Sequence, residues 1–511
     1  MKTIKPLCSL LLVLCLVFTC AGCQNEQEAL YSQALSSQTD EASEQESMPE
    51  SALQSSEPGD GLSGTLTIKT ASYLKNSSIN FLAEEFMQLH PQVKIEFDYE
   101  LGEAELNSLS RTERNMRRDS YYTQLRLELA SGEGDYLLYN VQEKLDLPSV
   151  SGLLEDIHEY WDSDPDIDPE EYFTPVLEAF TVGGKIPVLP FSFKYNGMYF
   201  SSSILQSLSA DTGSIQSVSC DDILDWYEEA RKSDPQLNLI FTSPGKDTLF
   251  AAEKPRYIDL ENKTADFQSP NFIRFLERTA AVSNEDPELD PESEIGISDP
   301  ELMNEKLRCL DTGADPSVTL GNFAELFGHL VTASRPAFAA QLDVGLAEMA
   351  SALHPMEYVA GPYPYTSSDG KLGITSLESF ALPVSCKNKD LAWAFMKHCV
   401  LPRDSVDFSH MGSRQRYTHD IPLSKTNLRN SLEDFAENGV PMMITEPRLD
   451  PMDLENTTEV LEQILSMPLV NTGAYGVDLQ DYLDEYYINA LTTPEQCAEK
   501  LQDRVNIWLH E

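Results

Sequence analysis

The sequence has 511 residues, of which 84 are Asp or Glu and 36 are Lys or Arg, so its formal net charge is −48. Such negative charge argues against binding to nucleic acid and against adhesion to anionic lipid, and it suits a neutral or cationic ligand. Once the N-terminal segments described next are set aside, the length predicts two or three domains.

The first residues have the pattern of a secretion signal. A basic start precedes an apolar run over residues 7–18, which is shorter than the ~20 residues that a membrane-spanning helix needs. The following Ala21-Gly22-Cys23 resembles the lipobox of bacterial lipoproteins, although Cys20 stands where that family usually has Leu. The resemblance implies a signal peptide that ends at Gly22, lipidation of Cys23, and a tether at the extracellular face of the cell membrane. An ordinary cleaved signal is the alternative, but no Ala-x-Ala site is visible.

Residues 23–63 have the composition of a linker. They are rich in Ser, Gln and Glu, they contain few large apolar side chains, and no Lys or Arg occurs before Lys69. A segment of this kind buries too little apolar surface to offset its ordering entropy, so we expect it to be disordered. Because its acidic charges repel one another, it should stay extended and hold the folded body away from the lipid.

The folded body begins with an alternation of strands and helices. Apolar residues alternate over 66–68, recur at helical spacing over 79–89, and alternate strictly over 93–99. A strand, a helix and a strand within about 35 residues form a βαβ unit, which predicts a parallel or mixed sheet. A second helical pattern over 122–132 ends at a glycine and leads into a strand over 136–139.

Two later helices are marked by the residues that precede them. Ser219 and Asp222 form a capping box before an apolar-periodic segment that ends near Ala230. Near the C-terminus, Thr493 and Gln496 flank a proline at the start of a helix with one apolar face. The pattern as a whole predicts an α/β protein.

Three groups of residues could suggest a calcium site, another metal site or a disulfide framework. The acidic run 162–168 resembles a calcium loop but lacks its glycine, so a solvated acidic turn is favoured and calcium is the alternative. His398 and Cys399, with His410, could bind a metal, but helical core spacing favours packing. The cysteines after Cys23 are odd in number and widely spaced, which predicts buried free thiols rather than a disulfide framework; they are Cys220, Cys309, Cys386, Cys399 and Cys497. We expect no metal and no cofactor.

Five segments, in the right order, resemble the extracellular solute-binding proteins of ABC transporters, the type that includes maltose-binding protein. They are residues 64–99, 127–136, 153–190, 379–395 and 500–511. Each segment alone is a weak signal, but five in sequence over nearly the whole mature chain are specific. The resemblance implies a two-lobe α/β fold, periplasmic-binding-protein-like and of type II, with a ligand cleft between the lobes.

The resemblance also implies that each lobe is built from two chain segments. Lobe one would comprise 64–192 plus 378–418, and lobe two 193–377 plus 419–511. The chain would cross between the lobes near 190–195, 371–377 and 414–422. A ligand held by both lobes favours the closed state, because only that state makes contacts on both sides.

The function implied is capture of a small solute, an oligosaccharide or a sugar derivative, and its delivery to the permease subunits of an ABC importer. The protein would act as a monomer, bind no nucleic acid and catalyse no reaction. Two alternatives stay open: a surface enzyme that acts on polysaccharide, and a sensor that passes the closed state to a signalling partner.

Sugar sites use flat aromatic faces for the apolar face of a pyranose ring, and amides or charged groups for its hydroxyls. By their place in the matched segments, nine residues are expected to contact the ligand: Tyr73, Tyr139, Asn140, Lys194, Tyr195, Asn196, Tyr363, Tyr365 and Tyr475. For each tyrosine the alternative is a half-buried packing residue. Lys194 stands where relatives often carry an acidic residue, so no single sugar specificity is carried over.

Overall fold

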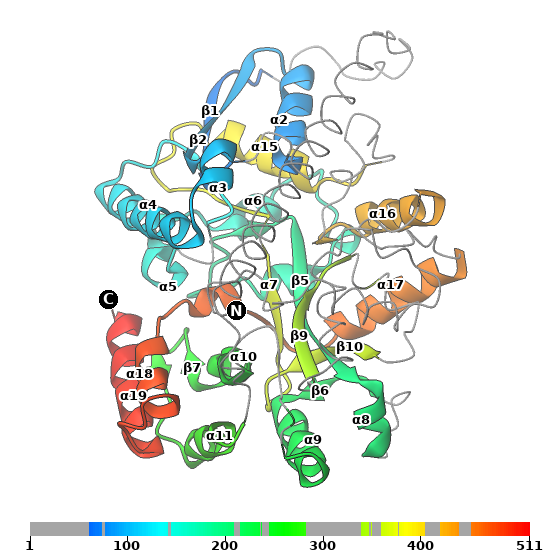
Figure 1. Cartoon of the computed structure of the whole chain (residues 1–511). Coiled ribbons are helices and arrows are strands. Elements are labelled where there is room, and N and C mark those ends of the chain that lie inside the picture. Colours follow the sequence, from blue (N-terminus) through cyan, green and yellow to red (C-terminus); the bar gives the residue numbers. More distant parts are fainter. Residues whose placement is uncertain are drawn as a thin grey trace, which may run out of the picture. The chain divides into compact units, whose positions relative to one another are not determined.

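Figure 1 shows the computed structural model of the chain. The structure describes residues 61–73, 77–141, 145–208, 215–235, 237, 245–282, 339–346, 349, 359–376, 378–403, 420–438 and 451–510. Two units divide the chain, and the second, Leu62–Glu511, contains every element discussed below. Cys23, nearly all of the linker, Cys309 and His410 lie outside the described residues.

A five-stranded sheet in the order β2-β1-β3-β12-β4 carries the first part of the chain. Its strands are β1 (Gly64–Ser72), β2 (Val93–Leu101), β3 (Leu137–Tyr139), β4 (Leu189–Pro190) and β12 (Ser379–Ala381). β1 pairs in parallel with β2 and β3, whereas β12 runs antiparallel to β3 and β4. The mixed sheet predicted from the βαβ pattern is therefore confirmed.

The helices of this region are mostly short. They are α2 (Ser78–Leu89), α3 (Glu103–Ser108), α4 (Arg111–Ser131), α5 (Leu147–Val150), α6 (Ile157–Trp161), α7 (Thr174–Glu178) and α15 (Lys389–Val400), with 3-10 turns η1 (Ser151–Leu153) and η2 (Pro169–Glu171). α2 is the predicted crossover helix, and it buries Phe86 against Phe395 of α15. α4 ends at Gly132, as predicted, with φ 79°. It begins 11 residues before the predicted Tyr122, because its first turns are polar and capped by Ser110.

A seven-stranded sheet carries the second part of the chain. Its strands are β5 (Ser192–Ser201), β6 (Val218–Ser219), β9 (Ala339–Val344), β10 (Val359–Thr366), β11 (Leu372–Thr375), β13 (Ile421–Pro422) and β14 (Leu469–Asn471). β5 is its central strand, because it pairs antiparallel with β9, β10, β11 and β13. Figure 1 shows it next to β9. A separate two-stranded sheet joins β7 (Ile258–Asp259) to β8 (Thr264–Ala265).

The remaining helices lie between the strands of the second sheet in sequence or after the last of them. They are α8 (Ser202–Ser207), α9 (Cys220–Ser233), α10 (Gly245–Glu253), α11 (Pro270–Ala280), α16 (Lys425–Asn438), α17 (Pro451–Leu465), α18 (Gln480–Tyr487) and α19 (Pro494–His510), with 3-10 turns η4 (Lys254–Tyr257) and η5 (Thr472–Tyr475). The capping box of Ser219 and Asp222 starts α9 as predicted. Thr493 and Gln496 exchange hydrogen bonds of 3.0 and 3.3 Å at the start of α19, which confirms the second capping prediction.

Buried side chains gather in two clusters. The first includes Ile68, Leu137 and Phe380 of the first sheet, and the second includes Phe200 and Trp508. The first cluster also takes in buried residues of α16 and α17, which the predicted boundaries assign to lobe two. The division of the chain between two lobes, with its boundaries, stays a prediction.

The groups that suggested other chemistry have partners inside the fold. Asp164 accepts hydrogen bonds from Trp393 Nε1 (2.8 Å) and Lys397 Nζ (3.1 Å), so the acidic turn is fixed against α15. His398 lies 3.2 Å from a carboxylate oxygen of Glu85. Among the described residues, no three His, Cys, Asp or Glu side chains are placed to hold a metal, and no helix is long and apolar enough to cross a membrane. Cys220, Cys386, Cys399 and Cys497 are buried free thiols, as predicted.

Candidate functional site

The three segments predicted to cross between the lobes lie side by side. Lys194 of β5 pairs with Thr375 of β11, and Ser192 of the same strand pairs with Pro422 of β13. The backbone of Phe191 continues the contact, since its N–H donates to Glu378 O (3.0 Å) and its carbonyl accepts from Leu423 N (3.0 Å). The first crossing segment is therefore hydrogen-bonded to both of the others.

Five polar side chains meet at this junction; together they are called the crossing cluster. They are Ser78, Ser192, Lys194, Glu378 and Asp420. Glu378 accepts hydrogen bonds from Ser78 Oγ (2.5 Å) and Ser192 Oγ (3.0 Å). Ser192 Oγ also lies 3.4 Å from Asp420 Oδ2, and Lys194 Nζ lies 3.3 Å from Asp420 Oδ1.

Burial governs the charge of the crossing cluster. Ser192 and Asp420 are buried, while Lys194 and Glu378 are half-buried. Burial and the nearby charge of Asp420 raise the pKa of Glu378 to about 7, against the smaller opposing effects of Ser78, Ser192 and Lys194. Desolvation penalises the ionised carboxylate, and a second negative charge penalises it further. Glu378 therefore exchanges its proton near neutral pH.

Two of the predicted ligand residues lie next to the crossing cluster. Tyr139 ends β3 and packs against the rings of Phe191 and Phe380, at centroid distances of 6.2 and 5.6 Å. Burial and the charge of Glu378 raise the pKa of the Tyr139 hydroxyl. Asn140 follows with φ 55°, and its N–H donates to Ser379 O (2.9 Å). The left-handed backbone turns the chain sharply where β3 ends, which is where ligands bind in open α/β sheets.

Tyr73 forms an aromatic platform with a residue that the sequence did not single out. Its ring stacks on Tyr99 at a centroid distance of 4.7 Å and an interplanar angle of 8°. Tyr99 is 45 % exposed, and Tyr73 is half-buried. The pair stands at the ends of the parallel strands β1 and β2. A flat, partly exposed pair of rings has the shape that a pyranose face requires.

The three consecutive residues on β5 do not share one face. Side chains alternate along a strand, so Lys194 and Asn196 project together and Tyr195 projects to the opposite side. Tyr195 is only 2 % exposed and belongs to the first core cluster. The Asn196 amide lies against Gly373, where an added Cβ would be 2.3 Å from Nδ2. Of the three, Lys194 and Asn196 have the half-buried side chains.

The predicted tyrosines of lobe two occupy different environments. Tyr365 is 1 % exposed inside the second core cluster, while Tyr363 is half-buried and packs near Phe200 (6.0 Å). Tyr475 on η5 is half-buried and packs against both core clusters. Burial, with the charges of Asp259 and Asp369, raises the pKa of Tyr475 to about 12. Tyr363 and Tyr475 thus keep some exposed surface, and Tyr365 keeps almost none.

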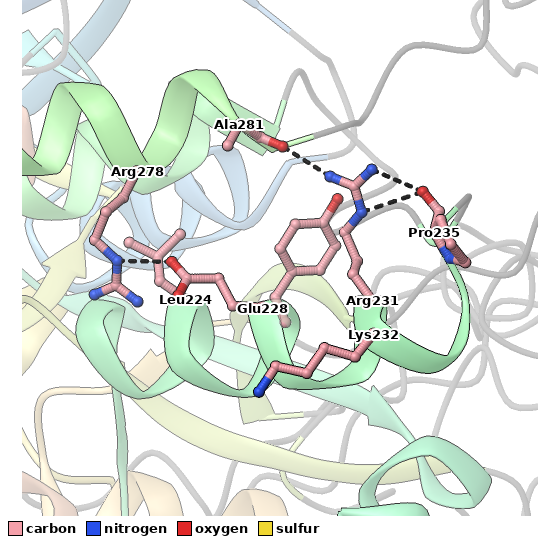
Figure 2. A pocket seen from close by; sticks show the side chains of 8 residues that line it. Leu224, Glu228, Arg231, Lys232, Pro235, Arg278 and Ala281 are labelled. Atoms are coloured by element: carbon pink, nitrogen blue, oxygen red, sulfur yellow. Dashed lines mark hydrogen bonds and ion pairs between the residues drawn. The ribbon is translucent and has the colours of Figure 1, made fainter.

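A cavity of about 300 Å³ lies elsewhere, between α9 and α11 (Figure 2). Arg231 donates to Pro235 O and Ala281 O on its rim, and Arg278 bonds the carboxylate of Glu228. No residue that the sequence singled out for binding lines it. Because its guanidinium groups already join neighbouring elements, we interpret it as a packing gap at the surface.

Comparisons with known proteins bear on the fold alone. No family model matches the chain, and no curated protein matches it. Among solved structures, an ABC substrate-binding protein from Listeria monocytogenes in complex with cycloalternan is 12 % identical. That match covers 87 % of this chain and 99 % of the other, with a TM-score of 0.50. A periplasmic oligogalacturonide-binding protein from Yersinia enterocolitica is 15 % identical over 88 % and 99 %, also with a TM-score of 0.50.

A structure of a different kind matches equally well. It comes from the directed evolution and rational design of a de novo designed esterase, and it is 15 % identical with a TM-score of 0.51 over 88 % of this chain and 99 % of the other. The chain has the two-lobe α/β fold of periplasmic solute-binding proteins, as the sequence resemblance predicted. Fold similarity at this level of identity does not by itself distinguish binding from catalysis.

Proposed function

We propose that the chain is an extracellular solute-binding protein that captures a small solute between its two lobes and delivers it to an ABC importer. The observation that carries the proposal is the junction of three crossing segments, where β5 is hydrogen-bonded to both β11 and β13. A short connection of three strands allows two lobes to rotate as rigid bodies about a single hinge. Lipidation of Cys23, an acidic linker over 23–63 and action as a monomer belong to the same proposal.

The solute is proposed to be an oligosaccharide or a sugar derivative. The stacked rings of Tyr73 and Tyr99 offer an apolar platform on lobe one, and Asn140 and Lys194 would supply polar groups for the hydroxyls of the sugar. The Listeria protein is in complex with cycloalternan, and the Yersinia protein is an oligogalacturonide-binding protein. Tyr363 and Tyr475 would contact the same solute from lobe two.

The test is thermal unfolding of the full chain with a panel of neutral oligosaccharides, oligogalacturonides and amino sugars. A ligand at 100 times its dissociation constant should add ~2.7 kcal/mol of stability, which moves the midpoint by a few degrees. We expect one class to shift the midpoint and to be recovered unchanged. Breakdown of the bound sugar would favour the polysaccharide-acting enzyme instead, and absence of any shift would contradict carbohydrate as the solute.

A matched pair of variants locates the binding surface. Tyr73→Ala removes one ring of the platform and should abolish most of the shift. Tyr160→Ala is the control, because Tyr160 is also a half-buried lobe-one tyrosine with an aromatic partner, Trp393 at 5.4 Å. Equal loss of the shift in both variants would contradict a role for the platform.

A further inference from the structure

Two consecutive arginines of α4 reach the residues next to the two rings of the aromatic platform. Arg118 Nε donates to Ser72 Oγ (3.3 Å), and Ser72 directly precedes the first ring in sequence. Arg117 donates to Glu100 Oε1 (2.7 Å) and to Glu100 O (2.9 Å), and Glu100 directly follows the second ring. Helix α4 therefore brings a guanidinium group to the end of each strand that leads to the platform.

The two arginines differ in their partners. The charge of Arg117 is paired with the carboxylate of Glu100. Arg118 is half-buried, and within the ranges that the structure describes it forms no ion pair and has Ser72 Oγ as its acceptor. Its Nη1 and Nη2 donors thus have no acceptor among those residues. In a chain with 84 acidic side chains against 36 basic ones, a half-buried arginine without a carboxylate partner is unexpected.

The opposite end of the platform is acidic. Burial, with the nearby Tyr99 hydroxyl and the charge of Glu84, raises the pKa of the Tyr73 hydroxyl. Asn80 forms a hydrogen bond with the same hydroxyl. Glu84 and Asn80 belong to α2, whereas Arg118 approaches from α4. The platform therefore has an amide and a carboxylate at its hydroxyl end, which suit sugar hydroxyls, and a cation at its backbone end.

We propose that Arg118 makes the platform selective for an acidic sugar, one that carries a carboxylate on its pyranose ring. The Nη1 and Nη2 donors of a guanidinium group form a planar fork that matches a carboxylate with two parallel hydrogen bonds. A uronate that stacks its apolar face on Tyr73 projects its carboxylate from the edge of the sugar ring, toward the border of the platform that Arg118 occupies. The inference rests on the proposed capture of a sugar and names the charge class of that sugar.

The large negative charge of the chain is compatible with an acidic ligand. The formal net charge is −48, and composition alone suggested a neutral or cationic ligand. At physiological ionic strength, however, salt screens the interaction between exposed charges beyond about 8 Å. Partly buried charges in direct contact are screened much less. Contact with Arg118 therefore determines which charge the ligand carries at this end of the platform.

The experiment compares acidic trisaccharides with their methyl esters by calorimetric titration of the full chain at pH 7. The probes are the trimers of galacturonate, mannuronate and guluronate, because esterification removes the charge and leaves the sugar ring in place. We expect at least one acid to bind at least tenfold more tightly than its ester, and its affinity to fall as salt is raised from 50 to 500 mM.

Failure of this inference is distinct from failure of the proposed function. A neutral oligosaccharide or an ester that binds as tightly as every acid, or more tightly, would overturn the charge preference and leave sugar capture in place. Absence of binding by every sugar, acidic or neutral, would overturn both.

Three variants make the test specific to Arg118. Arg118→Gln removes the charge and should weaken binding of the acid by roughly 10- to 100-fold, so that acid and ester bind alike. Arg118→Lys keeps the charge but loses the fork, so its preference for the acid should be intermediate. Arg274→Gln is the matched control, because Arg274 is an exposed arginine of α11 whose partner is Asn271 Oδ1 at 3.2 Å, and it should bind as the unchanged chain does.

Thermal midpoints without sugar show that each variant is folded. Equal preference for the acid in Arg118→Gln and in the unchanged chain would contradict the role of Arg118. The same would follow from an equal loss of preference in Arg274→Gln, because net charge alone would then explain the effect.

Discussion

Glu85 and Glu378 lie near the two ends of the same helix, α2, and their surroundings shift their pKa values in opposite directions. Glu85 projects from the last turns of α2 toward His398 and Arg403, whose hydrogen bonds and charges lower its pKa to about 2. Glu378 contacts the first residue of α2, but burial and the charge of another acid, Asp420, raise its pKa to about 7. Glu85 thus links α2 to α15 through His398, whereas Glu378 can gain or lose a proton near neutral pH.

The comparison shows that the partners of a glutamate and its burial determine whether its pKa is lowered or raised in this very acidic chain. A third case confirms it: Arg278 on α11 is surrounded by Asp221, Asp225 and Glu228 of α9, all more than half exposed. Water already solvates those acids, and exposed ion pairs contribute little stability. Substitutions in these environments should therefore differ in how their effect on stability depends on pH.

Replacing Glu378 with glutamine should remove the largest pH effect on stability. The folded protein holds a proton on Glu378 up to pH about 7, whereas an ordinary glutamate releases it near 4.5. The folded state therefore loses stability as pH rises from about 4.5 to beyond 7, by up to about 3 kcal/mol. Urea unfolding at pH 5 and pH 8 should show this fall in the unchanged chain and much less of it in Glu378→Gln. An equal fall in both would contradict the assignment.

Replacing Lys194 with methionine should destabilise the fold at neutral pH. The substitution keeps the apolar stem but removes the cation that lies 3.3 Å from Asp420 and attracts Glu378. Removing the cation beside a buried carboxylate costs roughly 2 kcal/mol. The loss should shrink at pH 5, where Glu378 is neutral, so comparing urea midpoints at the two pH values is the measurement. A loss that is larger at pH 5 than at pH 8 would contradict this description of the cluster.

Replacing Glu85 with glutamine should give a smaller effect with the opposite dependence on pH. Glu85 is 48 % exposed, so solvent screening limits its contribution to about 1 kcal/mol at pH 7. Its pKa is lowered, so the stability is present above pH about 4.5 and is lost as pH falls toward about 2. Thermal midpoints of the two proteins should therefore differ at pH 7 and converge at pH 3. Midpoints that diverge on acidification would be inconsistent with this interpretation.

Replacing Ser219 with alanine tests a local interaction that lies outside both glutamate environments. Ser219 Oγ accepts from Asp222 N (3.1 Å) at the start of α9, and caps of this type contribute about 0.5–1 kcal/mol. We expect that loss in urea unfolding, with equal size at pH 6 and pH 8. A loss that changed sharply between these two pH values would show that the crossing cluster is not the main source of pH dependence.

Local features of the fold could be predicted from the sequence because they depend on neighbouring residues. The alternation over 93–99, the glycine at 132 and the capping residues Ser219 and Thr493 each determine structure within a few positions. The start of α4 could not be found in this way, because its polar first turns carry no apolar period.

The candidate site was only partly predictable, for two physical reasons. Tyr195 was chosen for its place on the first crossing and Tyr365 for its Gly/Pro-rich surroundings, yet both lie in strands with their side chains in the cores. Glu378 and Asp420 were missed because they lie 186 and 228 residues from Ser192 in sequence, and only the fold brings them together. Polar residues inside crossing segments that are otherwise apolar are the signal that could have identified them.

Capture of a solute by two closing lobes can be tested by measuring the distance between the lobes with and without solute. Dyes on p-acetylphenylalanine introduced at Lys94 and Lys232, two well-exposed positions in the first and second sheet regions, would be followed at pH 7 while the oligosaccharide that stabilises the chain is added. Closure around a bound solute predicts a saturable change to one new distance, with the sugar recovered intact. Binding of the same sugar with no change in distance, or with its hydrolysis, would contradict capture by two closing lobes.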